Sequence, residues 1–218
     1  MPPTRILTPL QETFLSRIFL DPWFRENFYL TGGTALSAFY LYHRYSEDLD
    51  FFSHGTELDS IPKLIQDVSK ELNKKVIEVQ KSPGFLRFLV GDELKIDVVA
   101  DVGFRVGTPI FIDQIRVDTL KNIAVNKVCA ILGRLDIKDY VDLYIIFSQG
   151  EFDIFELLKQ GKEKDQGLDP FVWASLVAEV DKFNTLPRLI KPVTLDQVSV
   201  FFLRLRDQIL DSLNPISS

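Results

Sequence analysis

The chain has 218 residues and a formal net charge of −6, from 25 Lys and Arg against 31 Asp and Glu. Its 46% hydrophobic and 26% charged residues are typical of a globular protein with one or two domains, which excludes a disordered or collagen-like chain. One cysteine and two histidines exclude a disulfide framework and argue against a Cys- or His-rich metal site, and the acidic balance argues against a general nucleic-acid-binding protein.

No segment of the sequence has the character of a membrane span. The longest stretch without Asp, Glu, Lys or Arg runs from Asn27 to His43, and it is too short and is interrupted by a glycine pair. The first five residues lack the apolar core of a signal peptide. We therefore expect a cytoplasmic protein that makes no contact with a membrane.

Helix and strand signals are mixed in the first half of the chain. Apolar residues at helical spacing predict helices, short apolar or alternating runs predict strands, and Gly91-Asp92-Glu93 predicts a hairpin turn. In chain order the expected elements are a helix over 10–19, an apolar run at 27–30, a helix over 35–42, a strand at 49–52, a helix over 61–73, strands at 76–80, 85–90 and 94–99, and weaker strands at 104–106 and 110–112.

The second half of the chain carries helical signals only. The expected helices cover residues 120–132, 137–147, 152–162, 170–183 and 195–213. Asp118 and Asp136 are candidate N-caps, and Gly133 is a candidate helix stop. The sequence therefore predicts an α+β fold, with an α/β part that contains a mixed sheet over residues 1–117 and a helical part over residues 118–218, which either form two domains or share one core.

A glycine pair lies between the apolar run at 27–30 and the next expected helix. Gly32 and Gly33, followed by Thr34, let the backbone approach a ligand closely, and the N-terminus of the next helix directs N–H groups toward an anion such as phosphate. The alternative is a simple tight turn, in which glycine pairs are common. No P-loop pattern is present in the sequence.

Three aspartates are candidates for a metal site. Asp48 and Asp50 are two residues apart on an expected strand, so their side chains share one side of the sheet while Leu49 and Phe51 turn toward the core. Asp97 lies on a later strand and joins the pair if the two strands are neighbours. Carboxylates gathered in this way suit two divalent cations of a phosphoryl- or nucleotidyl-transfer site. The alternative is that all three are exposed charges on strand edges or half-buried strands.

The order of these motifs is typical of the nucleotidyltransferase fold of the polymerase-beta type. Gly32-Gly33-Thr34-Ala35-Leu36 and His43-Arg44-Tyr45-Ser46-Glu47-Asp48-Leu49-Asp50-Phe51-Phe52 resemble the abortive-infection nucleotidyltransferase toxins of the AbiEii/AbiGii type. The later pattern of that family is matched by Lys127-Val128-Cys129-Ala130, Arg134 and Asp139-Tyr140-Val141-Asp142-Leu143. The resemblance covers about residues 28–147, and it implies a nucleotidyltransferase fold for the N-terminal part.

Four residues of the helical half are further candidates. Lys127 and Arg134 are seven residues apart on one helical face, where they can bind a triphosphate, and we expect Lys127 to be catalytic as well. Asp139 and Asp142 are expected to support the site by positioning Lys127. The alternative is that they serve only the helix: Asp139 has capping-box spacing from Asp136, and Asp142 can form an ion pair with Lys138.

Two residues just before the Asp-x-Asp motif are expected to support the carboxylates. Arg44 and Ser46 have this role in the functional interpretation. The alternative for Arg44 is a favourable position at a helix C-terminus, where the helix dipole attracts a cation.

The resemblance implies an enzyme that uses Mg²⁺, with two divalent cations, to transfer a nucleotidyl group from an NTP to a hydroxyl of tRNA or protein. It also implies the toxin of a toxin–antitoxin or phage abortive-infection system, with a cognate antitoxin. Asp48, Asp50 and Asp97 are then the metal ligands, and Gly32, Gly33, Thr34, Lys127 and Arg134 hold the nucleotide. Two alternatives stay open: kinase-like phosphoryl transfer at the same site, and a catalytically inactive binding protein of the same fold.

Overall fold

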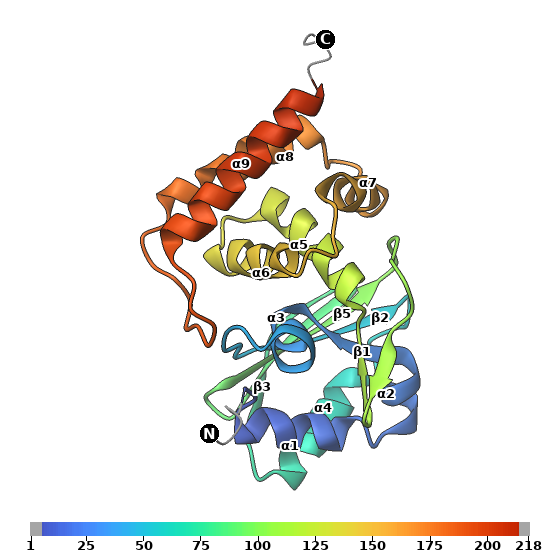
Figure 1. Cartoon of the computed structure of the whole chain (residues 1–218). Helices are drawn as coiled ribbons and strands as arrows, with labels where there is room; N and C mark the ends of the chain where they lie inside the picture. The colour runs from blue at the N-terminus through green and yellow to red at the C-terminus, as the bar shows by residue number, and fades with distance from the viewer. Residues whose placement is uncertain (1–5, 214–218) are drawn as a thin grey trace. The chain divides into compact units, whose positions relative to one another are not determined.

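The computed structural model describes residues 6–213 of the chain (Figure 1). Residues 1–5, on which the expected absence of a signal peptide rests, lie outside this part. The described chain divides into two compact units: the residues through Gly103 together with Gly107–Leu120 form the first, and Phe104–Val106 together with the residues from Lys121 onward form the second. Division into separate domains at residues 117 and 118 stays a prediction.

The first unit is built on one mixed sheet, which has seven strands within residues 6–213, in the order β3–β4–β5–β2–β1–β7–β6. The strands are β1 (Phe28–Thr31), β2 (Leu49–His54), β3 (Val76–Ser82), β4 (Phe85–Val90), β5 (Leu94–Asp101), β6 (Ile110–Ile112) and β7 (Ile115–Val117). Parallel pairs join β2 to β5 and β1 to β7, and the other neighbours are antiparallel. The expected α+β fold is confirmed.

Helices cover one face of this sheet. Side chains point alternately to the two faces along each strand, so the apolar ones can meet these helices. The helices of the first unit are α1 (Pro9–Ile18), α2 (Pro22–Asn27), α3 (Gly32–Ala35), a π-helical segment (Leu36–Leu41) and α4 (Ile61–Glu71). Figure 1 shows α1 and α4 on the same side of the sheet. Phe51 is fully buried on this side, where its ring contacts those of Phe19 and Phe24. Asp50, its neighbour on β2, therefore faces the opposite side.

The second unit is helical. Its helices are α5 (Leu120–Gly133, whose first residue belongs to the first unit), α6 (Ile137–Ser148), α7 (Ile154–Lys164), α8 (Pro170–Val177), a 3₁₀ segment (Ala178–Lys182) and α9 (Leu195–Leu213). Figure 1 shows α8 and α9 side by side. Trp173 of α8 is fully buried and donates a hydrogen bond from Nε1 to the carbonyl of Val128 at 2.9 Å. Tyr140 of α6 packs edge-on against Phe202 of α9.

Most of the expected elements are present, and the differences fall on short segments. Residues 104–106 form no strand; instead the Val106 N–H donates to the side-chain oxygen of Asn122 at 3.0 Å. Helix α2 and strand β7 were not expected from the sequence, and the helix expected over 170–183 tightens into a 3₁₀ segment after Val177. Asp136 caps α6 as expected. Within the described residues, no helix has both the length and the apolar character needed to cross a membrane.

We predict that Trp173 is a main stabilising residue of the second unit. Trp173→Ala is expected to lower the free energy of unfolding by about 3–5 kcal/mol, because the buried indole is lost and a cavity remains. Phe171 lies on the same helix but is 60% exposed, so Phe171→Ala should change stability by about 0.5 kcal/mol or less. Urea unfolding followed by circular dichroism measures both, and equal losses would contradict this packing.

Candidate active site

The glycine turn joins β1 directly to α3. Gly32 has φ of +69°, a left-handed conformation that favours glycine. Thr31, the last residue of β1, donates from Oγ1 to Oδ2 of the buried Asp118 at 2.8 Å. The Asp118 N–H in turn donates to the carbonyl of Leu30 at 2.9 Å. The end of β1, and with it the start of the helix, is therefore held by a buried carboxylate.

The two glycines leave room for functional side chains. A Cβ on Gly32 would lie 2.2 Å from Oδ2 of Asp50, and a Cβ on Gly33 would lie 2.4 Å from a guanidinium nitrogen of Arg44 and 3.0 Å from Oγ of Ser46. These distances are far below any van der Waals contact. A side chain at either position would therefore have to displace Asp50 or Arg44, and contact of the turn with phosphate stays a prediction.

Three aspartates converge beside this turn, and we call Asp48, Asp50 and Asp97 the carboxylate cluster. Strands β2 and β5 are parallel neighbours, and their register pairs Asp50 with Asp97. Asp48 lies two residues before Asp50, and its backbone carbonyl accepts a hydrogen bond from the Thr34 hydroxyl. The conditional expectation that Asp97 joins the other two is therefore met, and Asp97 is buried rather than exposed.

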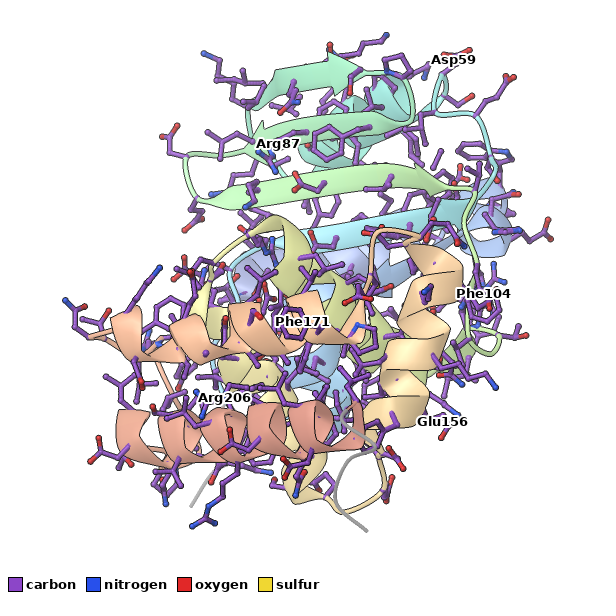
Figure 2. All side chains as sticks on the ribbon, turned by 90° about the horizontal axis from the view of Figure 1, so that it is seen from above. Asp59, Arg87, Phe104, Glu156, Phe171 and Arg206 are labelled. Carbon is purple, nitrogen blue, oxygen red and sulfur yellow. The ribbon has the colours of Figure 1, made fainter. Side chains whose placement is uncertain are left out.

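Two cations of the sheet are bound to the carboxylate cluster. Arg87 of β4, labelled in Figure 2, pairs in register with Asp97 and donates to both of its oxygens, from Nε and from a terminal guanidinium nitrogen, at 2.7 Å each. Lys95 of β5 reaches Oδ2 of Asp48 at 2.6 Å. The pKa of Arg87 is raised, first by its hydrogen bond to Asp97 and also by the charges of Asp97, Asp48 and Asp50, against the opposing effect of burial.

Arg87 and Lys95 were not among the residues expected from the sequence. A signal was nonetheless present, because the hairpin turn at Gly91-Asp92-Glu93 fixes the pairing of the strands on either side. Counting back from the pair Val90 and Leu94 brings Arg87 opposite Asp97. The register of a single hairpin was therefore enough to find Arg87.

Arg44 and Ser46 lie next to Gly33 of the glycine turn. Arg44 is buried, packs against Gly33 and donates from its guanidinium to the carbonyl of Tyr45 at 3.0 Å. The Ser46 carbonyl accepts a hydrogen bond from Gln11 of α1 at 2.9 Å, which ties the segment before β2 to the first helix. Support of the carboxylates by Arg44 and Ser46 stays a prediction, as does the alternative that Arg44 is placed by the helix dipole.

The second unit contains a buried cluster of its own, formed by Lys127, Asp139 and Asp142, which the exposed Arg134 covers from the solvent side. Lys127 Nζ lies 2.7 Å from Asp139 and 2.6 Å from Asp142, and both carboxylates are fully buried. Arg134 donates to both oxygens of Asp139 at 2.7 and 3.0 Å. Helix α5 ends at Gly133, so Arg134 lies just beyond it and the expected shared helical face is wrong; the two cations meet instead because both bind Asp139.

This geometry decides between the two interpretations of the paired aspartates. The carboxylate of Asp139 is bound by Lys127 and Arg134, while Asp136 alone provides the side-chain cap of α6, so a capping role for Asp139 is wrong. An exposed ion pair of Asp142 with Lys138 is likewise wrong, because Asp142 is fully buried against Lys127. Both aspartates contact Lys127, and a role in positioning it for the reaction stays a prediction. Nucleotide binding by Lys127 and Arg134 stays a prediction.

Burial and charge act in opposite directions on the pKa of Asp139. Burial raises it, but the charges and hydrogen bonds of Lys127 and Arg134 outweigh burial and hold the pKa below its ordinary value. The ionised form is therefore the one that the folded protein stabilises.

The donor set of the carboxylate cluster fits divalent cations. All three donors are hard oxygens, which Mg²⁺ prefers, and each carboxylate oxygen has a lone pair beyond those engaged by Arg87 and Lys95. Within residues 6–213, no three His, Cys, Asp or Glu side chains already surround one point closely enough to hold a metal ion. Cation binding would thus require these side chains to shift.

Comparison with known protein families identifies the family to which the chain belongs. The sequence model of the family described as "Nucleotidyl transferase AbiEii toxin, Type IV TA system" matches residues 13–213. The chain belongs to this family of nucleotidyltransferase toxins. A protein of Aquifex aeolicus (strain VF5), named "Uncharacterized protein aq_aa25", is 30% identical over 190 residues, which cover 82% of this chain and 86% of that protein.

Solved structures share the fold of this AbiEii family member. JHP933 from Helicobacter pylori superimposes with a TM-score of 0.61 at 20% identity, over 94% of this chain and 90% of that one. A putative nucleotidyltransferase from H. pylori gives 0.57 at 20% identity over 97% and 100% of the two chains. MenT4, a nucleotidyltransferase toxin from Mycobacterium tuberculosis H37Rv, gives 0.53 at 16% identity over 94% and 83%.

We predict that Gly32 is required by Asp50 and not only by its backbone conformation. Gly55 provides a matched control, because it also has a positive φ, +73°, but open space where a Cβ would lie. Gly55→Ala should cost the strain of a left-handed alanine, about 1–2 kcal/mol. Gly32→Ala should cost about 1–3 kcal/mol more, because Asp50 must move. Urea unfolding of the two variants measures the difference, and equal losses would rule out the contact.

We also predict that Asp139 makes stability depend on acid pH. A carboxyl whose pKa is lowered on folding stabilises the protein fully above its unfolded pKa, and that contribution is lost as the pH falls through the lower folded pKa. Wild type should therefore lose more stability between about pH 5 and pH 3 than Asp139→Asn. At pH 7 the variant should be about 3–5 kcal/mol less stable, because a buried partner of Lys127 is removed.

Unfolding by urea across this pH range tests that prediction. Asp153 is a suitable control, because it is an exposed N-cap of α7 and asparagine caps helices equally well. Asp153→Asn should follow the wild-type pH profile, and an Asp139→Asn profile parallel to it would show that Asp139 contributes nothing specific.

Proposed function

We propose that this toxin-family protein is a Mg²⁺-dependent nucleotidyltransferase that transfers a nucleotidyl group from an NTP to a hydroxyl acceptor. One observation carries the proposal: the register of β2 and β5 brings Asp50 beside Asp97, next to the glycine turn and two residues after Asp48. Membership of the AbiEii family supports the reaction class.

The carboxylate cluster would hold two divalent cations. When bound, such cations neutralise the charge of a triphosphate and make an acceptor hydroxyl more acidic. The parts of the chain around the cluster serve the nucleotide: the N–H groups of Gly32, Gly33 and Thr34 lie at the N-terminus of a helix, where the helix dipole favours phosphate. The Thr34 hydroxyl is bonded to the Asp48 carbonyl, so Thr34 would contribute its backbone.

The reaction itself is a substitution at the α-phosphorus. The acceptor oxygen forms a bond to that phosphorus, the bond to the bridging oxygen of the β-phosphate breaks, and pyrophosphate leaves. Asp97 is our candidate to receive the proton of the acceptor hydroxyl, because the strand register places it beside Asp50. Lys127 and Arg134 are proposed to bind phosphate oxygens, with Asp139 and Asp142 setting the position of Lys127.

The acceptor and the biological setting follow from the family. We infer that the acceptor is a hydroxyl of tRNA or of a protein, and that the protein acts in the cytoplasm, where NTPs are available. A type IV toxin–antitoxin family implies an antitoxin partner.

The proposal predicts that nucleotide binding needs both Mg²⁺ and Asp48. With an NTP at 100 times its Kd, the wild type should gain about 2.7 kcal/mol of stability, seen as a rise in melting temperature. Asp48→Asn should show no such rise. Asp67→Asn, which removes an exposed carboxylate on α4, is the control and should behave as wild type. An NTP shift that survives in Asp48→Asn would place the nucleotide elsewhere.

Labelled nucleotides then identify the reaction. The NTP that stabilises the protein most is offered with α- or γ-label to tRNA and to total protein. Transfer of the α-label with release of pyrophosphate supports nucleotidyl transfer. Transfer of the γ-label alone would identify a kinase-like enzyme, and the absence of any NTP shift would favour an inactive binding protein.

A further inference from the structure

The carboxylate cluster is bound by two cations that the proposed reaction does not use. Arg87 and Lys95 come from adjacent strands and face the same side of the sheet as Asp97, since Lys95 is two residues before it on β5 and Arg87 is its cross-strand partner. Between them they hold two of the three carboxylates, Asp97 and Asp48. Their positions are therefore fixed by sheet register and not by chance contact of surface side chains.

Electrostatics explains why the cations are there. Carboxylates brought this close repel one another strongly unless positive charge lies between them. A divalent cation would supply the same charge in the same space. The two guanidinium–carboxylate bonds and the ammonium contact would then compete with it, because positive charges that share one small volume repel.

Arg87 and Lys95 are both partly exposed to solvent at the carboxylate cluster. Arg87 and Lys95 are about one-third exposed, at 34% and 38%, whereas Lys127 in the buried cluster of the second unit is 8% exposed. In the same conformation the Arg87 guanidinium lies 5.3 Å from the ring centre of Phe85 on its own strand, a contact at the sheet surface that does not depend on Asp97. Displacement of such partly exposed side chains would require rotation of the side chains alone and no change in the sheet.

We propose that Arg87 and Lys95 are built-in counter-ions of the carboxylate cluster, and that a divalent cation binds the cluster by displacing them. This inference rests on the metal site of the proposed function. It assigns to the pair a role opposite to that of metal ligands: they hold the carboxylates together before the cation arrives, and they weaken its binding.

The test measures Mn²⁺ binding to the full chain by electron paramagnetic resonance of the free ion, without nucleotide. Arg87→Gln removes one competing charge and should bind Mn²⁺ about tenfold more tightly than wild type. Lys95→Gln should tighten binding in the same direction. Asp50→Asn, added to each variant, should abolish the tight binding and so locate it at the cluster.

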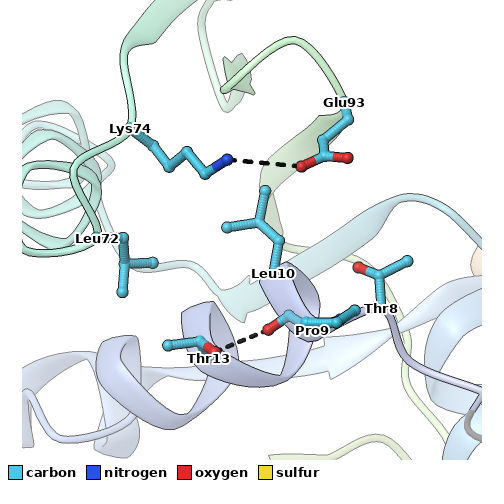
Figure 3. A pocket seen from close by; sticks show the side chains of 7 residues that line it. All are labelled: Thr8, Pro9, Leu10, Thr13, Leu72, Lys74 and Glu93. Carbon is cyan, nitrogen blue, oxygen red and sulfur yellow. Dashed lines mark hydrogen bonds and ion pairs between the residues drawn. The ribbon is translucent and has the colours of Figure 1, made fainter.

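A matched control separates local competition from net charge. Lys74 lies in the same unit and pairs with Glu93 at 3.7 Å across a pocket of about 430 Å³ that contains none of the cluster residues (Figure 3). Lys74→Gln changes the net charge by the same amount as Arg87→Gln. We expect Lys74→Gln to bind Mn²⁺ with nearly the affinity of the wild type.

The outcomes distinguish this inference from the proposed function. One outcome is that the wild type binds Mn²⁺ through Asp50 while Arg87→Gln binds it no more tightly than Lys74→Gln. In that case the displacement of the counter-ions is wrong, and the metal site of the proposed function is supported. If neither the wild type nor any variant binds Mn²⁺, the displacement of the counter-ions is wrong, and the NTP shift with Mg²⁺ decides the proposed function separately. Should Arg87→Gln fail to fold, Lys95→Gln decides the question, because it removes a single, more exposed contact.

Discussion

Repulsion between neighbouring carboxylates is the constraint on which the first unit depends. Asp50 and Asp97 are adjacent across a parallel strand pair, and Asp48 lies two residues before Asp50. Such a group costs free energy in any fold that does not compensate it. The compensation is local: Arg87 binds Asp97, Lys95 binds Asp48, and Gly32 has no side chain, so the Asp50 carboxylate can lie against the start of a helix, where the dipole favours an anion.

The sheet topology fixes which carboxylates are adjacent. β2 and β5 are parallel, and the chain between them returns through α4 and the antiparallel strands β3 and β4. A slip of one residue in the register of β5 would turn Asp97 toward the face that α1 and α4 cover, and Ile96 would turn outward. Because Ile96 and Phe51 are fully buried on that face, the hydrophobic core itself holds the carboxylates in place. The core and the site are thus specified by the same alternation of residues.

The sequence was informative where the signal is local or periodic. Runs of apolar residues on either side of a hairpin turn identified β4 and β5. The spacing of Asp48, Asp50 and Asp97 was enough to predict their convergence once β2 and β5 were assumed to be neighbours. Helix α2 is only six residues long, too short for a periodic pattern, although Asp21 and Pro22 form a recognisable start. The burial of Lys127 between Asp139 and Asp142 depends on how α5 and α6 pack, and no spacing within either helix reveals it.

The charges of the two clusters indicate why binding of a triphosphate would need a divalent cation. Arg87 and Lys95 are outnumbered by the carboxylates of their cluster, and in the second unit Lys127 and Arg134 meet an equal number of carboxylates. Three neighbouring carboxylates and a net charge of −6 on the whole chain disfavour a triphosphate at the carboxylate cluster. A polyphosphate would be repelled by the carboxylate cluster unless positive charge came with it, as it does with Mg²⁺. In this respect the counter-ions and the metal are linked: the cations of the chain keep the carboxylates together, and bound Mg²⁺ would turn the same group into a site for phosphate.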